Sequence, residues 1–154
     1  METILLILTS TQKFHRGFAR AIELAKGRKL YVLFVLDKRG VKGMSASLRD
    51  MSFIGLKSSG QLTSMVTDEY RLRAVRMLDE LEQHASDLNL DCSTRLAMGD
   101  FSEEVLRFVE NKKPSSIVIN RLFDSYLSRY IYKSRYDELV ASLSIPIEIV
   151  DEDI

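Results

Sequence analysis

Cationic and aromatic side chains are interleaved over residues 121–136, a combination that could bind an anion. These residues are Arg121, Arg129, Lys133 and Arg135, with Tyr126, Tyr130, Tyr132 and Tyr136 between or beside them. Cations beside stacking rings suit anionic or nucleotide ligands. One hypothesis is a modified phosphate site, in which Arg121 and Lys133 bind by charge and Asn120 and Ser134 add hydrogen bonds. The alternative, which we favour, is a solvated amphipathic helix whose tyrosines pack at an edge or a dimer contact.

The other residues with chemical potential do not assemble a catalytic or metal site. His15 and His84 fall on different predicted helices, and neither has a Cys or His at metal-ligand spacing, so we expect surface or capping roles. Cys92 is the only cysteine and cannot form an internal disulfide, which favours a reduced compartment and a packing role. The chain has neither a Gly-x-Ser-x-Gly elbow nor a Walker loop. The sequence therefore favours a non-catalytic protein.

Composition indicates one cytoplasmic domain. The 154 residues are 45% apolar, which is enough for one substantial core. Lys plus Arg and Asp plus Glu number 22 each, so no net charge draws the chain to nucleic acid or to an anionic membrane. The N-terminus has no basic segment or cleavage site typical of a signal peptide, and its apolar run is too short to span a bilayer.

Five segments are predicted as strands, and helical patterns lie between them. The segments are Ile4–Leu8, Leu30–Leu36, residues 92–98, Ile117–Ile119 and Ile147–Val150. Strands that alternate with helices predict a parallel five-stranded sheet with helices on both faces, a three-layer α/β sandwich, over a single domain of residues 1–154. A ligand is then expected at the carboxyl ends of the strands, near a topological switch point.

Helical spacing predicts the segments between the strands. The first helix has its buried face at Phe14, Phe18, Ala21, Ile22 and Ala25; Thr9, Ser10 or Thr11 caps it, and Gly27 ends it. The second starts at Thr67, with Asp68 and Glu69 in its first turn and a buried stripe at Ala74, Val75, Leu78, Leu81, Ala85 and Leu88. Residues 38–66 before it have no sustained period, and we expect a long loop excursion.

Two further helices complete the pattern. Asp100 and Glu103 have capping-box spacing at the start of the third, whose apolar face is Phe101, Val105, Phe108 and Val109, and Pro114 stops it. The last spans Tyr136–Leu143, with apolar residues at 136, 139, 140 and 143.

This layout and several local strings resemble the universal stress protein family, over essentially the whole chain. Val35-Leu36-Asp37 looks like the family's second-strand ending, and Met98-Gly99-Asp100 like its third-strand exit. Residues 116–119 and 144–150 look like its fourth and fifth strands. The resemblance implies a Rossmann-like fold, a role in stress response, and homodimerisation through the last strand, Ile147 to Val150, whose apolar residues could be buried at a dimer contact.

The family's nucleotide-binding members carry a glycine signature after the fourth strand. Glycines let the backbone approach phosphates closely, and amides and a hydroxyl supply donors. The matching positions here are Asn120, Phe123 and Lys133-Ser134, so the spacing is kept while all three glycines are replaced and only Ser134 is retained. Thr9 stands where ATP-binding members have an Asp after the first strand. The Ser-Gly-Gly-x-Asp-Ser loop of adenylate-forming relatives is also missing.

From this resemblance we expect a non-catalytic regulatory or interaction domain that has lost ATP binding and needs no cofactor. The alternative is a protein that binds a nucleotide or another anionic metabolite, with ATP or another adenine nucleotide as ligand and weak hydrolysis as a potential activity. Its candidate ligand-binding residues, by resemblance, are Thr9, Ser10, Val35, Asn120, Arg121, Lys133 and Ser134.

Overall fold

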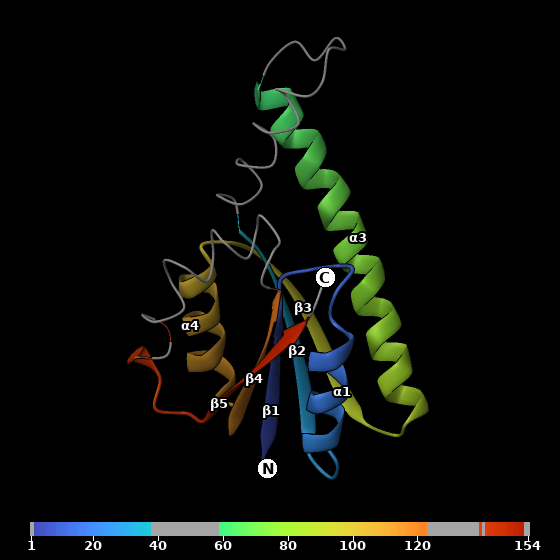
Figure 1. The fold of residues 1–154 in the computed structure, drawn as a ribbon, viewed down its shortest axis with the longest axis vertical. Coiled ribbons are helices and arrows are strands. Elements are labelled where there is room, and N and C mark those ends of the chain that lie inside the picture. The colour runs from blue at the N-terminus through green and yellow to red at the C-terminus, as the bar shows by residue number, and fades with distance from the viewer. Residues whose placement is uncertain (1, 38–58, 123–138, 140, 153–154) are drawn as a thin grey trace.

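A computed structural model of the chain describes residues 2–37, 59–122, 139 and 141–152. Its strands are β1 (Thr3–Leu8), β2 (Lys29–Asp37), β3 (Asp91–Gly99), β4 (Ser116–Leu122) and β5 (Ile147–Glu152). They form a parallel five-stranded sheet in the order β3-β2-β1-β4-β5 (Figure 1). The parallel three-layer α/β sandwich expected from the sequence is confirmed.

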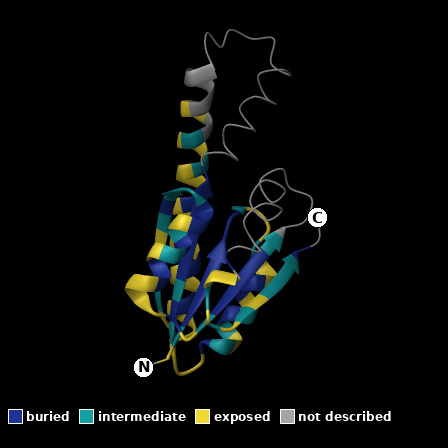
Figure 2. Cartoon of the chain, turned by 90° about the vertical axis from the view of Figure 1, so that its left-hand side faces the viewer, coloured by how far each residue is buried: buried dark blue, intermediate teal, exposed yellow. Residues whose placement is uncertain are grey.

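Helices cover both faces of the sheet. On one face, α1 (His15–Leu24) and α3 (Ser59–Asp87) pack on the even-numbered residues of β1 and β2. On the other, α4 (Phe101–Lys112) packs on the odd-numbered residues of β1 and β4, together with the buried Leu139. The inner strand β1 is buried on both faces, and its Ile4–Leu8 run is fully inaccessible to solvent (Figure 2). Residues 139, 141 and 142 are helical, within the predicted Tyr136–Leu143 helix.

The prediction that α3 starts at Thr67 is wrong, because the helix already begins at Ser59. Residues 59–66 therefore belong to α3 and not to the predicted excursion, of which 38–58 lie outside the described residues. Asp68 and Glu69 are consequently not in the first turn. The start of α3 extends beyond the carboxyl edge of the sheet, and Met65 there is 58% exposed (Figure 1). Ser64 is exposed as well, and exposed positions do not contribute to the buried stripe from which a helix is read in a sequence.

The predicted stripe of α3 is correct at four of its six positions. Ala74, Leu78, Leu81 and Ala85 are buried, whereas Val75 and Leu88 are about half exposed. Leu88 follows the end of the helix, and Val75 faces away from the sheet. Met77, which was not predicted, is buried in place of Val75.

The cap prediction is confirmed for α4 and wrong for α1. The Asp100 carboxylate accepts a hydrogen bond from the Glu103 amide at 3.0 Å, as the capping-box spacing predicts. Helix α1 instead begins after Phe14, with no side-chain cap from its own N-terminal residues. It also ends at Leu24, and Gly27 follows in the turn with a φ of 73°. The α1 cap comes from distant strands.

Candidate functional site

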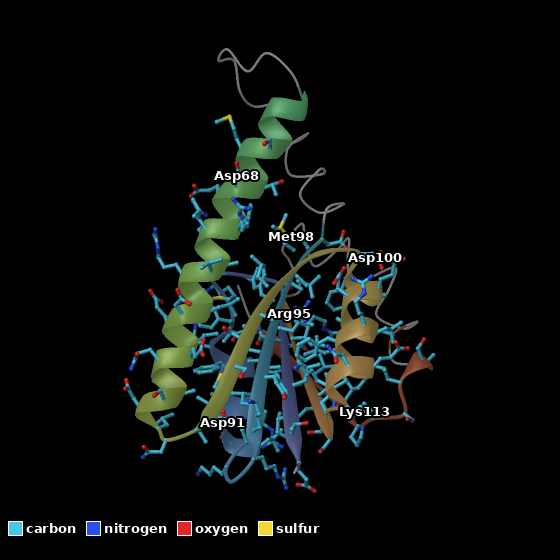
Figure 3. The ribbon with its side chains drawn as sticks, turned by 180° about the vertical axis from the view of Figure 1, so that it is seen from behind. Asp68, Asp91, Arg95, Met98, Asp100 and Lys113 are labelled. Atoms are coloured by element: carbon cyan, nitrogen blue, oxygen red, sulfur yellow. The ribbon has the colours of Figure 1, made fainter. Side chains whose placement is uncertain are left out.

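The polar residues of interest gather at the carboxyl edge of the sheet, around the exit of β1. This strand lies between β2 and β4, whose connecting helices α1 and α4 run on opposite faces. It is thus the topological switch point at which parallel α/β sheets bind ligands. Figure 3 shows the carboxyl end of the sheet from behind, with the exit of β3 marked by Met98 and Asp100.

The loop after β1 is held by its own side chains. Thr9 is buried, and the Ser10 hydroxyl accepts hydrogen bonds from the amides of Gln12 at 3.2 Å and Lys13 at 3.1 Å. Ser10 therefore stabilises the turn between β1 and α1. This role differs from the predicted helix cap, because the helix starts only at His15.

Asn120 joins the end of β4 to the beginning of α1. It is 2% exposed; its Oδ1 accepts the Gly17 amide at 2.9 Å, and its Nδ2 donates to the Lys13 carbonyl at 2.8 Å. A Cβ on Gly17 would lie only 2.5 Å from the Asn120 Cβ, so the Asn120 side chain can approach α1 this closely only because residue 17 is glycine. The Asn120 side chain thus fills the space at the exit of β4.

Glu152 supplies a second cap to the same helix. Its buried carboxylate accepts a hydrogen bond from the Arg16 amide. The first amides of a helix have no intrahelical acceptor and carry a partial positive charge, so a carboxylate there is favourable. The N-terminus of α1 is closed by Asn120 and Glu152, which lie 103 and 136 residues further along the chain than the amides they bind.

Arg121 lies on the other face of the sheet and is paired with Asp151. The two residues are direct partners in the β4–β5 register. The Arg121 Nε donates to Asp151 Oδ1 at 2.6 Å, and its terminal nitrogen donates to Oδ2 at 3.1 Å. This two-point arrangement is a strong form of ion pair, and it commits the guanidinium to a carboxylate of the protein.

Asp37, at the exit of β2, caps the start of α4 as Glu152 caps the start of α1. It is 2% exposed, and its Oδ2 accepts the Phe101 amide at the start of α4 at 2.9 Å. Val35, a predicted ligand contact, is 1% exposed and packs in the core between the sheet and α4. Its side chain therefore contributes to the core.

The remaining predicted site residues, Lys133 and Ser134, lie outside the described part of the chain, as do Phe123 and the tyrosine-rich stretch up to Tyr136. The structure thus brings Asn120 to the loop after β1 and gives Arg121 a partner of its own.

Among the described residues, no cluster of three or more His, Cys, Asp or Glu could hold a metal. In the same part of the chain, no helix is long and apolar enough to span a membrane.

Sequence reasoning missed the residues that close this edge, namely Glu152, Asp151, Asp37 and Gly17. Asp151 and Glu152 lie beyond the predicted end of the last strand at Val150, but in the structure they extend β5 by two residues. The alternation of Glu148, Val150 and Glu152 on one face of that strand was the available signal.

The fold matches solved structures of universal stress proteins. A protein of that family from Burkholderia pseudomallei has a TM-score of 0.65 at 18% identity, over 97% of this chain and 95% of that one. A universal stress protein from Archaeoglobus fulgidus in complex with dAMP has a TM-score of 0.58 at 14% identity, over 97% and 96%. One from Arabidopsis thaliana with AMP bound has a TM-score of 0.57 at 12% identity, over 98% and 92%.

No family model and no curated protein sequence matches the chain. The resemblance inferred from the sequence is therefore confirmed at the level of the fold, which is that of the universal stress proteins.

Proposed function

We propose that this chain is a cytoplasmic, non-catalytic regulatory or interaction domain of the universal stress type, which does not bind ATP in the mode of the family's ATP-binding members. The observation that carries the proposal is the closure of the α1 N-terminus by Asn120 and Glu152. Asn120 occupies the position matched to the first glycine of the nucleotide-binding signature. Its side chain is bonded to α1, so the backbone there does not offer the open approach that a phosphate needs.

The local charge supports the same conclusion. Arg121 is neutralised by Asp151, and Glu152 adds a further carboxylate at the neighbouring exit of β5. A triphosphate bound beside them would place like charges close together, in a partly buried setting where repulsion is only weakly screened. Binding that used the Arg121 guanidinium would require the Arg121–Asp151 pair to open.

The test is thermal unfolding of the purified protein with and without millimolar ATP, AMP or a cyclic dinucleotide, each with magnesium. A ligand that binds only the folded state raises the midpoint. The proposal expects no shift with ATP. A clear, saturable rise that results from ATP bound at the exit of β4 would overturn it.

A second candidate function is binding of a nucleotide or another anionic metabolite at a modified phosphate site. Two structural neighbours were solved with dAMP or AMP bound, and this favours the second candidate. The bound nucleotides are properties of those proteins. Arg121→Ala tests it, because this hypothesis requires Arg121 to bind the anion and predicts that AMP affinity is lost. Unchanged AMP affinity in the variant would remove Arg121 from any such site.

We further propose a homodimer formed through β5. This strand ends the sheet order and carries the partly buried Ile147 and Ile149. Apolar residues on an edge strand favour pairing with a second chain. Sedimentation velocity should give a dimer at micromolar concentration, and a monomer at every concentration would contradict the proposal.

A further inference from the structure

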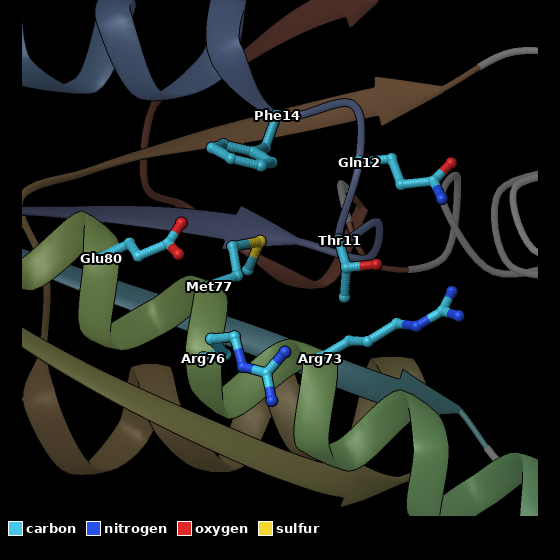
Figure 4. Close-up of a pocket in the computed structure, with 7 residues that line it drawn as sticks. All are labelled: Thr11, Gln12, Phe14, Arg73, Arg76, Met77 and Glu80. Carbon is cyan, nitrogen blue, oxygen red and sulfur yellow. The ribbon is translucent and has the colours of Figure 1, made fainter.

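A pocket of about 310 Å³ opens between the loop after β1 and the side of α3 (Figure 4). The loop side is formed by Thr11, Gln12 and Phe14, and the helix side by Arg73, Arg76, Met77 and Glu80. The pocket lies on the face of the sheet that α1 and α3 cover. It is therefore separate from the Arg121–Asp151 pair, which lies on the opposite face.

Two arginines, Arg73 and Arg76, line this pocket. Arg73 and Arg76 are one helical turn apart on α3, and Figure 4 shows the Arg73 side chain extended along the opening beneath Thr11. The Arg73 Nε donates a hydrogen bond to Glu69 at 2.9 Å, which fixes the side chain. The terminal nitrogens belong to the same planar guanidinium group and carry further donors. Within the described residues, no carboxylate forms an ion pair with Arg76. Guanidinium groups of this kind suit a planar carboxylate or a phosphate.

The inner wall of the pocket is apolar and already ordered. Met77 is 5% exposed and belongs to the core, and the Phe14 ring is partly buried and stacks on His15 with 4.4 Å between ring centroids. The loop that carries Thr11 and Gln12 is fixed by the Ser10 hydroxyl and by the Asn120 bond to Lys13. Walls that are already ordered lower the entropic cost of binding a small molecule.

Glu80 places a negative charge at one end of the pocket. Figure 4 shows it at the opposite end from Arg73 and Gln12, with Met77 between. A bound molecule would therefore place its oxyanion at the guanidinium groups that line the α3 side, and an apolar body against Met77 and Phe14. Glu80 would disfavour a second anionic group and would accept a hydrogen bond from a hydroxyl or amine.

We propose that this pocket is a binding site for a small metabolite with one phosphate or carboxylate on a flat apolar body. Such a ligand would connect the loop after β1 to α3, and would stabilise the folded state by its binding free energy. Binding in this pocket involves no residue at the exit of β4, so it does not depend on whether ATP binds at that exit.

Phenyl phosphate, phenylacetate and uncharged benzyl alcohol are suitable probes for calorimetric titration of the full-length protein in low-salt buffer. The two anions should bind, and benzyl alcohol should not. Comparison of phenyl phosphate with phenylacetate then identifies the preferred oxyanion. Arg76→Gln should weaken anion binding by about tenfold or more, which corresponds to the loss of a charged hydrogen bond.

The matched control is Arg71→Gln, because Arg71 is an exposed cation on the same helix that pairs with Asp68 and does not line the pocket. It removes the same charge and should bind the anions like wild type. Equal affinity in Arg76→Gln and wild type would overturn the proposal, as would equal losses in both variants. Failure of the wild-type protein to bind either anion at millimolar concentration would also overturn it.

Discussion

The Asn120 carboxamide and the backbone of Gly17 are in direct contact, with a hydrogen bond of 2.9 Å from the Gly17 amide to Asn120 Oδ1. A Cβ placed on Gly17 would stand 2.5 Å from both the Cβ and the Oδ1 of Asn120. The packing of the end of β4 against the first turn of α1 therefore depends on both residues. This contact occupies the place where nucleotide-binding relatives are expected to have a bare glycine backbone.

Gly17→Ala should destabilise the protein, although alanine is the better helix former by up to about 1 kcal/mol. The added methyl has no room, so Asn120 must move and its two hydrogen bonds to α1 and its preceding loop must weaken. Overpacking of this kind costs about 1–3 kcal/mol. Urea unfolding of the variant and wild type measures the difference.

A double-mutant cycle checks the cause. With Asn120→Gly in place, the clash is gone, and adding Gly17→Ala should cost much less than it does in wild type. An equal cost in both backgrounds would contradict the contact as the source of the loss.

Glu152→Gln should lower the free energy of unfolding by about 0.5–2 kcal/mol, the range for a charge at a helix terminus in a partly buried setting. The substitution keeps the shape of the side chain and removes the negative charge that faces the Arg16 amide. Glu148→Gln is the control, because Glu148 lies four residues earlier on the same face of β5 and makes an exposed ion pair with Arg20. It should have the smaller effect, as exposed pairs contribute little. A larger effect of Glu148→Gln would argue against a cap by Glu152.

Cys92 should react slowly with thiol reagents in the native protein. Burial raises the pKa of its thiol to about 11, and the neighbouring Glu82 and Asp91 act in the same direction. Since the thiolate is the reactive form, only roughly one molecule in a thousand is reactive at pH 8. Alkylation by iodoacetamide should be far slower in the native than in the urea-unfolded protein, and should speed up with pH toward 11. Equal rates at pH 8 would contradict this environment.

The same shift links stability to pH. The folded-state pKa is raised above the ordinary value of 9.0, so folding favours the protonated thiol. The resulting stabilisation is complete below pH 9 and is lost as the pH rises from about 9 to about 11. Cys92→Ser should lose less stability than wild type over that interval.

The strands and α4 were predictable because their signals are local. Runs such as Ile4–Leu8 are apolar on both faces, and the Asp100–Glu103 cap lies within four residues. The cap of α1 was not predictable, since no local residue provides it and its partners come from β4 and β5. For the same reason Glu152 could not be distinguished from a terminal acidic tail. The pairing of Arg121 with Asp151 depends on the β4–β5 register, which only the assembled sheet defines.

The measurement that tests the central claim most directly is a calorimetric titration of the wild-type protein and of Arg76→Gln with magnesium ATP. The variant is included so that binding at the α3 pocket is not counted as binding at the exit of β4. We expect no saturable heat in Arg76→Gln up to millimolar ATP, because Asn120 is hydrogen-bonded to α1 and the carboxylates of Asp151 and Glu152 add negative charge at the neighbouring end of β5. Micromolar binding of ATP that is the same in both proteins would contradict the account.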